Sequence, residues 1–442
     1  MAFSSPTDAS LVSPDGTRPN VLLITVDTLR ADHLGAYGYR LPTSPEIDRL
    51  ASEGVLFTDA ITPVPTTAPA LASLLTSRHA DGHGVRENFG ELPDGLTTIG
   101  ETFAEAGYDT AAFYGNGAIQ NGFGQGFGRF EAFADHWFFR DKAGTDKAIA
   151  WLETAKAPWF LWIHFMDPHG PYNSSASDRS AALEYPDTPP LARELPKVEQ
   201  NYGYGVIPKY QQLPEHSRVI DYVRRYDGEI IGTDIEVGRL RAALESSGTL
   251  DTTLIVLTAD HGESLGEGRY YFQHGKLLNE PSVRVPLVLR HPALPRGLRN
   301  PTPASLVDVF PTIAALTDVS PPRGLAGRDL SAAIRTPETA ASTIRVTYTV
   351  TSNHKTAIRR GPWELRGTPQ RNGAADDFQK VELFDTRTSP PTRIPEGEQP
   401  EVRAELEPLL HTAAKKVREK PAAHRTPTED EKKRLRALGY ID

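Results

Sequence analysis

The chain has 442 residues, enough for one large α/β unit with an appendage or for two or three domains. Its net charge of −9 argues against a nucleic-acid-binding surface, and the absence of cysteine excludes disulfides, thiolate metal sites and cysteine nucleophiles. The longest apolar runs have the length of a strand, which is too short for a membrane span. We therefore expect no nucleic-acid partner and no membrane span, and the oligomeric state stays open.

The first part of the chain, residues 1–19, is polar and rich in proline and serine. It lacks the basic and then apolar pattern of a signal peptide. We expect this stretch to be a disordered leader and the protein to be cytoplasmic. A periplasmic or secreted protein whose signal has been removed is the alternative.

Apolar stretches of strand length alternate with amphipathic helical patterns from residue 20 to residue 334. The strand patterns lie at 20–26, 109–117, 158–170 and 251–264, and the helical patterns at 44–54, 98–107, 145–155 and 217–248. This alternation predicts an α/β fold in which a mainly parallel sheet is sandwiched by helices. Residues 172–214 lack the periodicity and are expected to form a lid or insertion within this domain.

The composition changes near residue 335. Residues 335–397 alternate like antiparallel strands around a Gly-Pro turn, which predicts a small C-terminal antiparallel-sheet subdomain. Residues 398–442 are charged with helical spacing, and we expect them to form a helical tail.

Polar residues suited to a metal site stand at the ends of the predicted strands. Asp27 closes the first strand, Asp260 and His261 close a later one, and Thr67 begins a helical pattern. Ligands of such sheets bind beyond the carboxyl ends of the strands, so we expect these four residues to meet. Two carboxylates, an imidazole and a hydroxyl suit one divalent cation, which would lower the pKa of the hydroxyl.

Three more residues lie in the same predicted loops. His169, His274 and Lys276 are suited to neutralising a tetrahedral anion or to protonating a leaving oxygen. The alternative for both histidines is a purely structural role. A second zinc held by Asp167 together with the two histidines is another alternative.

Thr67 also admits a simpler interpretation. A threonine before Ala-Pro at the start of a helix is typical of an N-cap, so Thr67 is either a cap or a nucleophile. Thr66 is the alternative nucleophile. His164 lies inside a predicted strand and is interpreted as structural.

A series of segments, in order along nearly the whole chain, resembles the sulfatase branch of the alkaline phosphatase superfamily. The segments are PNVLLITVDTLRADHLGAYGY, SPEIDRLASEGVLFTDAIT, APALASLLTSRHADGHGVREN, FMDPHGPY, YDGEIIGTDIEVGRL, LTADHGESLGE, FQHGKLLNEPSVRVPLVLR and SLVDVFPTIAAL. The resemblance implies an alkaline-phosphatase-like fold and a hydrolase of small anionic esters.

The resemblance also implies roles for individual residues. Asp27, Asp260 and His261 match metal ligands of the family. His169 matches a histidine that contacts the transferred group or the leaving oxygen, and Lys276 matches a lysine that binds the anion. Substrate contacts are implied at two further positions, Asn88 and Asn116.

One departure from the family concerns the nucleophile. The family's maturation motif runs Cys or Ser, any residue, Pro, any residue, Arg, whereas this chain has Thr67-Ala68-Pro69-Ala70-Leu71. Formylglycine arises by oxidation of Cys or Ser, so the resemblance implies that Thr67 keeps its hydroxyl and forms a covalent ester. This favours hydrolysis of a phosphodiester or phosphonate monoester, with phosphate monoesters as a further option. The alternatives are sulfuric ester hydrolysis, transfer of a phospho-alcohol group, and an inactive binding homologue.

A second departure concerns the metal. Thr28 stands where the family has a second aspartate, and His261 stands where calcium sulfatases have asparagine. One carboxylate fewer and one imidazole more shift the expected ion from calcium toward manganese or zinc. We expect one divalent metal ion, with Mn or Zn favoured and Ca or Mg as alternatives.

Overall fold

The N-terminal end of the described chain packs against the core. The computed structural model describes residues 10–133, 141–172, 177–337, 347–350, 354–370, 374, 377–388, 390–419, 428–429 and 432. The side chain of Leu11 is buried in the hydrophobic core, and its N–H donates to the Leu316 carbonyl oxygen at 2.7 Å. The expectation of a disordered leader is therefore wrong for residues 10–19, and residues 1–9 lie outside the described part.

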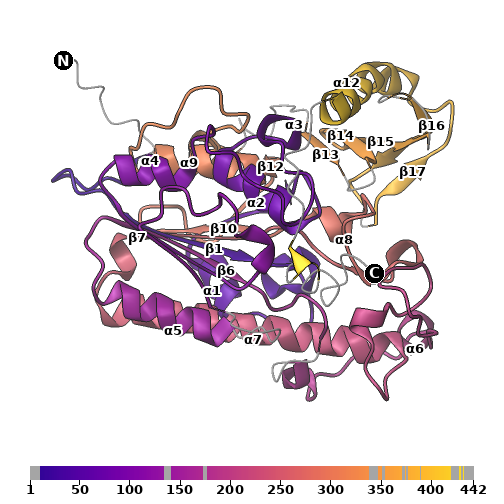
Figure 1. Cartoon of the computed structure of the whole chain (residues 1–442), viewed down its shortest axis with the longest axis horizontal. Coiled ribbons are helices and arrows are strands. Elements are labelled where there is room, and N and C mark those ends of the chain that lie inside the picture. Colours follow the sequence, from indigo (N-terminus) through magenta and orange to yellow (C-terminus); the bar gives the residue numbers. More distant parts are fainter. Residues whose placement is uncertain are drawn as a thin grey trace.

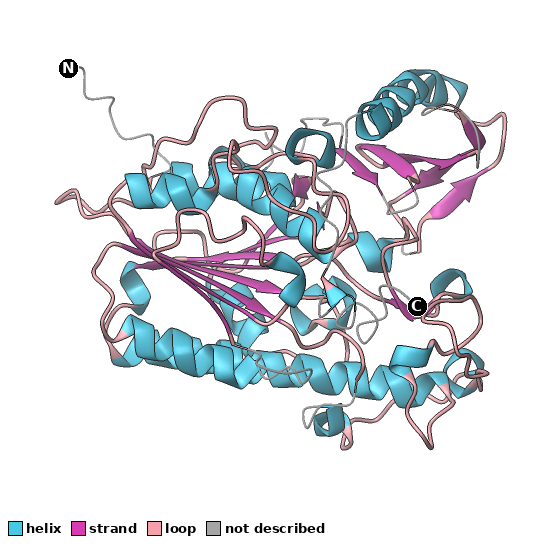
Figure 2. Cartoon of the chain, in the orientation of Figure 1, coloured by secondary structure: helices cyan, strands magenta, loops and turns pink. Residues whose placement is uncertain are grey.

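An eight-stranded sheet forms the centre of the larger unit (Figures 1 and 2). Its order is β11-β2-β10-β7-β1-β6-β4-β5; β10 runs antiparallel to both neighbours, and the other pairs are parallel. The strands are β1 Asn20–Val26, β2 Val55–Phe57, β4 Asp109–Tyr114, β5 Arg129–Ala132, β6 Trp159–Phe165, β7 Thr253–Ala259, β10 Leu287–Arg290 and β11 Leu298–Asn300. The three central strands are buried along their length and mostly apolar because both faces of the sheet are covered.

Helices cover both faces of this sheet, with α2, α4 and α9 on one side and α1, α5 and α7 on the other (Figure 1). The longer helices are α1 Pro45–Glu53, α2 Thr67–Thr76, α4 Ile99–Glu105, α5 Asp141–Leu152, α7 Val219–Ser246 and α9 Val309–Leu316. The shorter ones are α3 Ala80–His83, α6 Pro189–Ala192, α8 Glu280–Val283 and α10 Ser331–Arg335. The prediction of a mainly parallel sheet between helices is confirmed. None of the described helices is both long and apolar enough to cross a lipid bilayer.

Two small strand pairs lie outside the main sheet. β3 Ala60–Ile61 pairs with β12 Ala304–Ser305, and β8 Ser264–Leu265 pairs with β9 Tyr271–Gln273. The expected insertion, described at Tyr172 and from residue 177 onward, includes α6 and docks on β9, where the Tyr210 hydroxyl donates to the Phe272 carbonyl oxygen at 2.7 Å. Its movement as a lid stays a prediction.

A separate antiparallel sheet forms the C-terminal subdomain, as predicted. Its strands, in order, are β13 Thr347–Val350, β14 Thr356–Arg360, β15 Trp363–Pro369, β16 Phe378–Asp385 and β17 Thr392–Ile394. Helix α12, Pro400–Glu419, buries its apolar face on this sheet in a core of Ile358, Leu365, Leu383, Leu406, Leu410 and Ala413. The boundary expected at residue 398 is therefore wrong, because the sheet needs the apolar cover that this helix provides.

Candidate active site

The register of three central strands brings the predicted carboxylates together. Val26 of β1 lies opposite Phe165 of β6 on one side and Ala259 of β7 on the other. Asp27 and Asp260 directly follow β1 and β7, so both carboxylates emerge at the same edge of the sheet. Both are fully buried.

Thr67 is the first residue of α2, and its hydroxyl points at this pair of loops. Thr67 Oγ1 lies 3.4 Å from Asp27 Oδ2 and 3.4 Å from His261 Nε2. The N-cap residue is Thr66, and the amide of Ala68 is capped by Asn88 Oδ1 at 2.9 Å. The N-cap interpretation of Thr67 is therefore wrong, and the α2 N-terminus, which favours anions, opens onto the site.

The tautomer of His261 is fixed by the backbone. A carbonyl oxygen can only accept, so the 2.9 Å contact between His261 Nδ1 and the Gly262 oxygen places the proton on Nδ1. The lone pair of Nε2 then points toward Asp27 Oδ1 at 3.8 Å and Asp260 Oδ2 at 3.5 Å. Burial, followed by the nearby His274, lowers the pKa of His261 to about 3, so the ring is neutral and suited to a metal.

Asp27 has one oxygen held by the protein and one without a protein partner. Asn116 Nδ2 donates to Asp27 Oδ2 at 2.6 Å, so Asn116 positions a carboxylate besides any contact with substrate. Asp27 Oδ1, Asp260 Oδ2 and His164 Nε2 are buried and find no hydrogen-bond partner among the described residues. Because buried polar atoms are normally satisfied, these orphaned atoms indicate a missing ligand.

The chemistry of these atoms fits a divalent cation. Ligand atoms of Asp27, His164 and Asp260 all lie within 4.8 Å of one another. Burial, followed by the charge of Asp27, raises the pKa of Asp260, and a cation between the two carboxylates would remove this repulsion. The alternative second zinc at Asp167 gains no support, because the convergence found among the described residues does not include Asp167.

The sequence analysis interpreted His164 as structural, whereas the structure places its side chain beside Asp27. His164 Nε2 lies 3.7 Å from Asp27 Oδ2, and its Nδ1 contacts Thr25 Oγ1 at 2.9 Å. That hydroxyl also accepts the Trp162 indole N–H at 2.9 Å, which fixes the ring from behind. A histidine in an otherwise apolar strand is costly to bury without a partner, and this is the signal from which a role could have been inferred.

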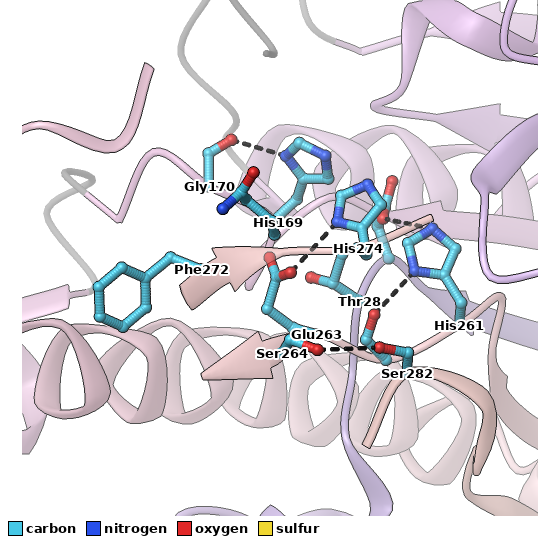
Figure 3. A network of polar contacts seen from close by, with 12 residues as sticks. Thr28, His169, Gly170, His261, Glu263, Ser264, Phe272, His274 and Ser282 are labelled. Carbon is cyan, nitrogen blue, oxygen red and sulfur yellow. Dashed lines mark hydrogen bonds and ion pairs between the residues drawn. The ribbon is translucent and has the colours of Figure 1, made fainter. Parts of the chain in front are cut away.

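Two histidines and a glutamate form the outer wall of the site (Figure 3). The His274 ring lies 4.5 Å from the His261 ring and 5.1 Å from the His169 ring, measured between centroids. His274 Nδ1 is 3.3 Å from Glu263 Oε1, and Tyr172 donates to the other Glu263 oxygen at 3.1 Å. Burial lowers the pKa of His169, lowers that of His274 to about 4 and raises that of Glu263 to about 7.

The segment after His274 passes directly over the start of α2. A Cβ atom on Gly275, which has a φ of +85°, would stand 3.2 Å from Thr66 Oγ1, so this glycine permits a close approach of the backbone. Lys276 follows, and its Nζ lies 3.8 Å from the centre of the Tyr202 ring. His274 and Lys276 are half-buried, whereas the other assigned residues are buried, so this segment marks the outer side of the site. Asn88 lies on the α2 side, and its Nδ2 is buried without a partner among the described residues.

Thr28 is held in a strained conformation beside the carboxylates. Its φ is +55°, a region that β-branched residues rarely adopt, and its N–H donates to Asp260 Oδ1 at 3.1 Å. The carbonyl of Thr28 accepts from the Tyr226 hydroxyl at 2.7 Å, and its own hydroxyl is buried without a partner among the described residues. Such strain, about 1–3 kcal/mol, is typical of functional sites.

Thr28 gives a test of metal preference. We expect Thr28→Asp to add a third carboxylate and to raise the affinity for calcium relative to manganese by about tenfold, because calcium prefers charged oxygen ligands. Competition between the two ions, followed by unfolding temperature and by elemental analysis, measures this shift. Thr28→Asn, which adds an oxygen without a charge, is the matched control; an equal shift in both variants would contradict the argument from charge.

A family model and several curated proteins are similar to this chain. A sequence model described as Sulfatase matches residues 19–319. The chain is 26% identical over 347 residues to an ulvan-active sulfatase of Formosa agariphila. This alignment covers 73% of this chain and 66% of that protein. It is 28% identical over 412 residues to the multifunctional alkaline phosphatase superfamily protein PehA of Trinickia caryophylli, covering 71% of this chain and 76% of that protein.

Solved structures share the fold over nearly the whole chain. A structure determined in complex with its substrate D-glucosamine-2-N,6-O-disulfate has a TM-score of 0.75 at 19% identity, covering 92% of this chain and 100% of that one. The phosphonate monoester hydrolase of Agrobacterium radiobacter has a TM-score of 0.69 at 21% identity, covering 93% and 99%. Several of the similar proteins are named as sulfatases.

Proposed function

Because the chain belongs to the sulfatase family of ester hydrolases, we propose that it cleaves a phosphodiester or phosphonate monoester with the Thr67 hydroxyl as nucleophile. The observation that carries this proposal is the placement of that hydroxyl. It is fully buried and stands 3.4 Å from both Asp27 Oδ2 and His261 Nε2, at the start of α2. A hydroxyl retained there supports attack on phosphorus through a covalent ester.

The residues present would hold one divalent cation. Asp27, Asp260, His261 and the Thr67 oxygen are its proposed ligands. His164, whose ligand atom converges with those of Asp27 and Asp260, is a further candidate ligand. When bound, such an ion would lower the pKa of the Thr67 hydroxyl and so favour its deprotonated form. A neutral His261 and the deprotonated Asp27 match this set, and manganese or zinc is the proposed ion.

The proposed reaction proceeds in two displacements. Thr67 Oγ1 forms a bond to phosphorus while the bond from phosphorus to the leaving oxygen breaks. Because burial lowers the pKa of both His169 and His274, the proton for that oxygen is assigned to Glu263, whose pKa is raised to about 7. Glu263 protonates His274 Nδ1 across their 3.3 Å contact while the other His274 nitrogen protonates the leaving oxygen, with His169 beside it. Lys276, Asn88 and the α2 N-terminus stabilise the negative charge on the other oxygens. Water then attacks phosphorus, the bond to Thr67 breaks, and the acid leaves with the Thr67 hydroxyl restored.

Sulfate-ester hydrolysis is the second candidate, and the names of the similar proteins favour it. The same double displacement at sulfur would use Thr67 without any oxidation of its side chain. Leu71, which stands at the motif's arginine position, is fully buried in the hydrophobic core and offers no positive charge to a doubly charged ester. This lack of charge supports esters that carry a single negative charge over phosphate monoesters. Phosphodiesters, phosphonate monoesters and sulfate esters all carry one charge, so Leu71 does not separate the two candidates.

A panel of aryl esters tests the proposal. The full chain is assayed with p-nitrophenyl phosphate, bis(p-nitrophenyl) phosphate, p-nitrophenyl phenylphosphonate and p-nitrophenyl sulfate, each with manganese, zinc, calcium or magnesium. We expect kcat/KM for the diester or phosphonate to exceed that for the doubly charged phosphate monoester by at least about tenfold, because a singly charged ester needs less cationic support. The sulfate carries the same single charge as the diester, so the ratio of their kcat/KM values decides between the two candidates. Faster sulfate cleavage would transfer the proposal to the second candidate, and binding of metal without any turnover is the result expected of an inactive homologue.

A further inference from the structure

Two tyrosines of the insertion are exposed beside the outer side of the site. Tyr202 is 49% exposed and Tyr204 is 53% exposed, which makes them the exposed aromatic side chains among the described residues. One face of the Tyr202 ring is covered by Lys276 Nζ at 3.8 Å. Large apolar side chains that remain exposed in this way mark sites of interaction when they gather at one place.

The loop that carries these tyrosines is fixed to the catalytic segment. The backbone N–H of Gly203 donates to Gln273 Oε1 at 3.1 Å, and Gln273 Nε2 donates back to the Gly203 carbonyl oxygen at 2.9 Å. Gln273 immediately precedes His274. This double hydrogen bond therefore fixes the position of the exposed rings relative to the residue that faces His261.

A third tyrosine connects the exposed rings to the site. The Tyr204 and Tyr270 ring centroids lie 5.4 Å apart, and the Tyr270 hydroxyl donates to the His274 carbonyl oxygen at 2.9 Å. Tyr202, Tyr204 and Tyr270 together are called the tyrosine platform below. It contacts the Lys276 ammonium group and the His274 backbone, so it lies beside the segment that carries a proposed proton donor and a proposed anion ligand.

We propose that the tyrosine platform is a stacking subsite for the leaving alcohol, which makes the substrate an ester of a ring alcohol. The inference rests on the proposed function, because it places the leaving oxygen near His274. Flat faces, either the aromatic face of an aryl group or the C–H face of a sugar ring, stack on tyrosine and gain from burial of its exposed area. An acyclic alcohol gains little from such a surface.

Matched esters of primary alcohols test the subsite, because their leaving oxygens have similar basicity. The probes are the ethyl, benzyl and methyl-glucoside 6-O esters, each prepared as the methyl phosphate diester and as the sulfate. We expect KM for a ring ester to be about five- to tenfold lower than for the ethyl ester, with kcat little changed. Tyr204→Ala removes this preference and Tyr204→Phe keeps it, since the ring carries the effect.

The controls separate the subsite from other roles of the tyrosines. Tyr204 is the cleaner position, because Tyr202→Ala also uncovers Lys276 and would change all three esters together. Ile235→Ala, which removes the remaining large exposed apolar side chain among the described residues, should leave every KM unchanged. A preference for benzyl over glucoside, or the reverse, identifies the kind of ring.

The outcomes distinguish the two proposals. Turnover of ethyl and ring esters with equal KM, or a ring preference that survives Tyr204→Ala, overturns the subsite while leaving the proposed function intact. A change of oligomeric state in Tyr204→Ala without a change of KM assigns the platform to contact between copies and also overturns it. Failure of every ester to react overturns the proposed function itself.

Discussion

Thr67→Ala is expected to lower turnover of the best ester by at least about a thousandfold, because it removes the attacking oxygen. The same change should alter the free energy of unfolding by less than about 1 kcal/mol, since Thr66 rather than Thr67 is the N-cap residue of α2. Thr67→Ser keeps the hydroxyl and should retain part of the activity. Steady-state kinetics and urea unfolding of the three proteins measure both quantities.

Two further observations make this prediction specific to Thr67. The wild-type protein, quenched with acid during turnover, should carry a covalent adduct on the peptide that contains Thr67, and Thr67→Ala should carry none. Thr66→Ala is the control, because its hydroxyl lies one residue away and should not be required for attack. Undiminished activity in Thr67→Ala, or an adduct on Thr66, would assign the nucleophile elsewhere.

Replacing Asp260 with its amide is expected to have opposite effects on the stability of the metal-free and metal-bound protein. Asp260→Asn and Asp27→Asn should each prevent metal binding, which removes the stabilisation of about 2.7 kcal/mol that an ion supplies at a hundred times its dissociation constant. Without metal, Asp260→Asn should be at least as stable as wild type, because burial and the charge of Asp27 already raise the pKa of Asp260. Unfolding curves with manganese and with a chelator, together with elemental analysis, give both results.

Asp234→Asn is the matched control for a buried carboxylate. Asp234 lies on α7 and accepts from the backbone N–H groups of Glu46 and Ile47, so it caps α1. Among the described residues, its hydrogen bonds involve none of the proposed metal ligands. Because burial raises the pKa of Asp234 to about 7 as well, this variant should change the free energy of unfolding equally with and without metal and keep its metal-induced stabilisation. Full metal occupancy in Asp260→Asn would contradict the site as assigned.

His164 and His261 are expected to contribute differently to metal binding. His164→Gln, which keeps a polar group in the strand, should weaken metal binding less than His261→Gln does, because Asn116 still holds Asp27 in place. The difference is measured by titration with manganese. Equal loss in the two variants would make His164 a ligand rather than a neighbour of one.

Much of the catalytic unit could be predicted from the chain alone. Strands buried on both faces have continuous apolar runs, and an aspartate directly after such a run stands at the carboxyl edge of a parallel sheet. This local rule located Asp27 and Asp260, and the helical start at Thr67 followed from its own sequence. The parallel sheet, the flanking helices and the small antiparallel sheet were predicted on the same grounds.

Contacts between distant segments were decided only by the tertiary structure. Leu11 packs on Leu316, and α12 covers the C-terminal sheet, because apolar faces are buried wherever the fold places a partner for them. The same holds for the N-cap residue of α2, the orientation of His164 and the contact of Lys276 with Tyr202, none of which has a local signature. Local periodicity determines which elements form and what their ends carry, whereas the packing of side chains far apart in the sequence determines which of those ends meet.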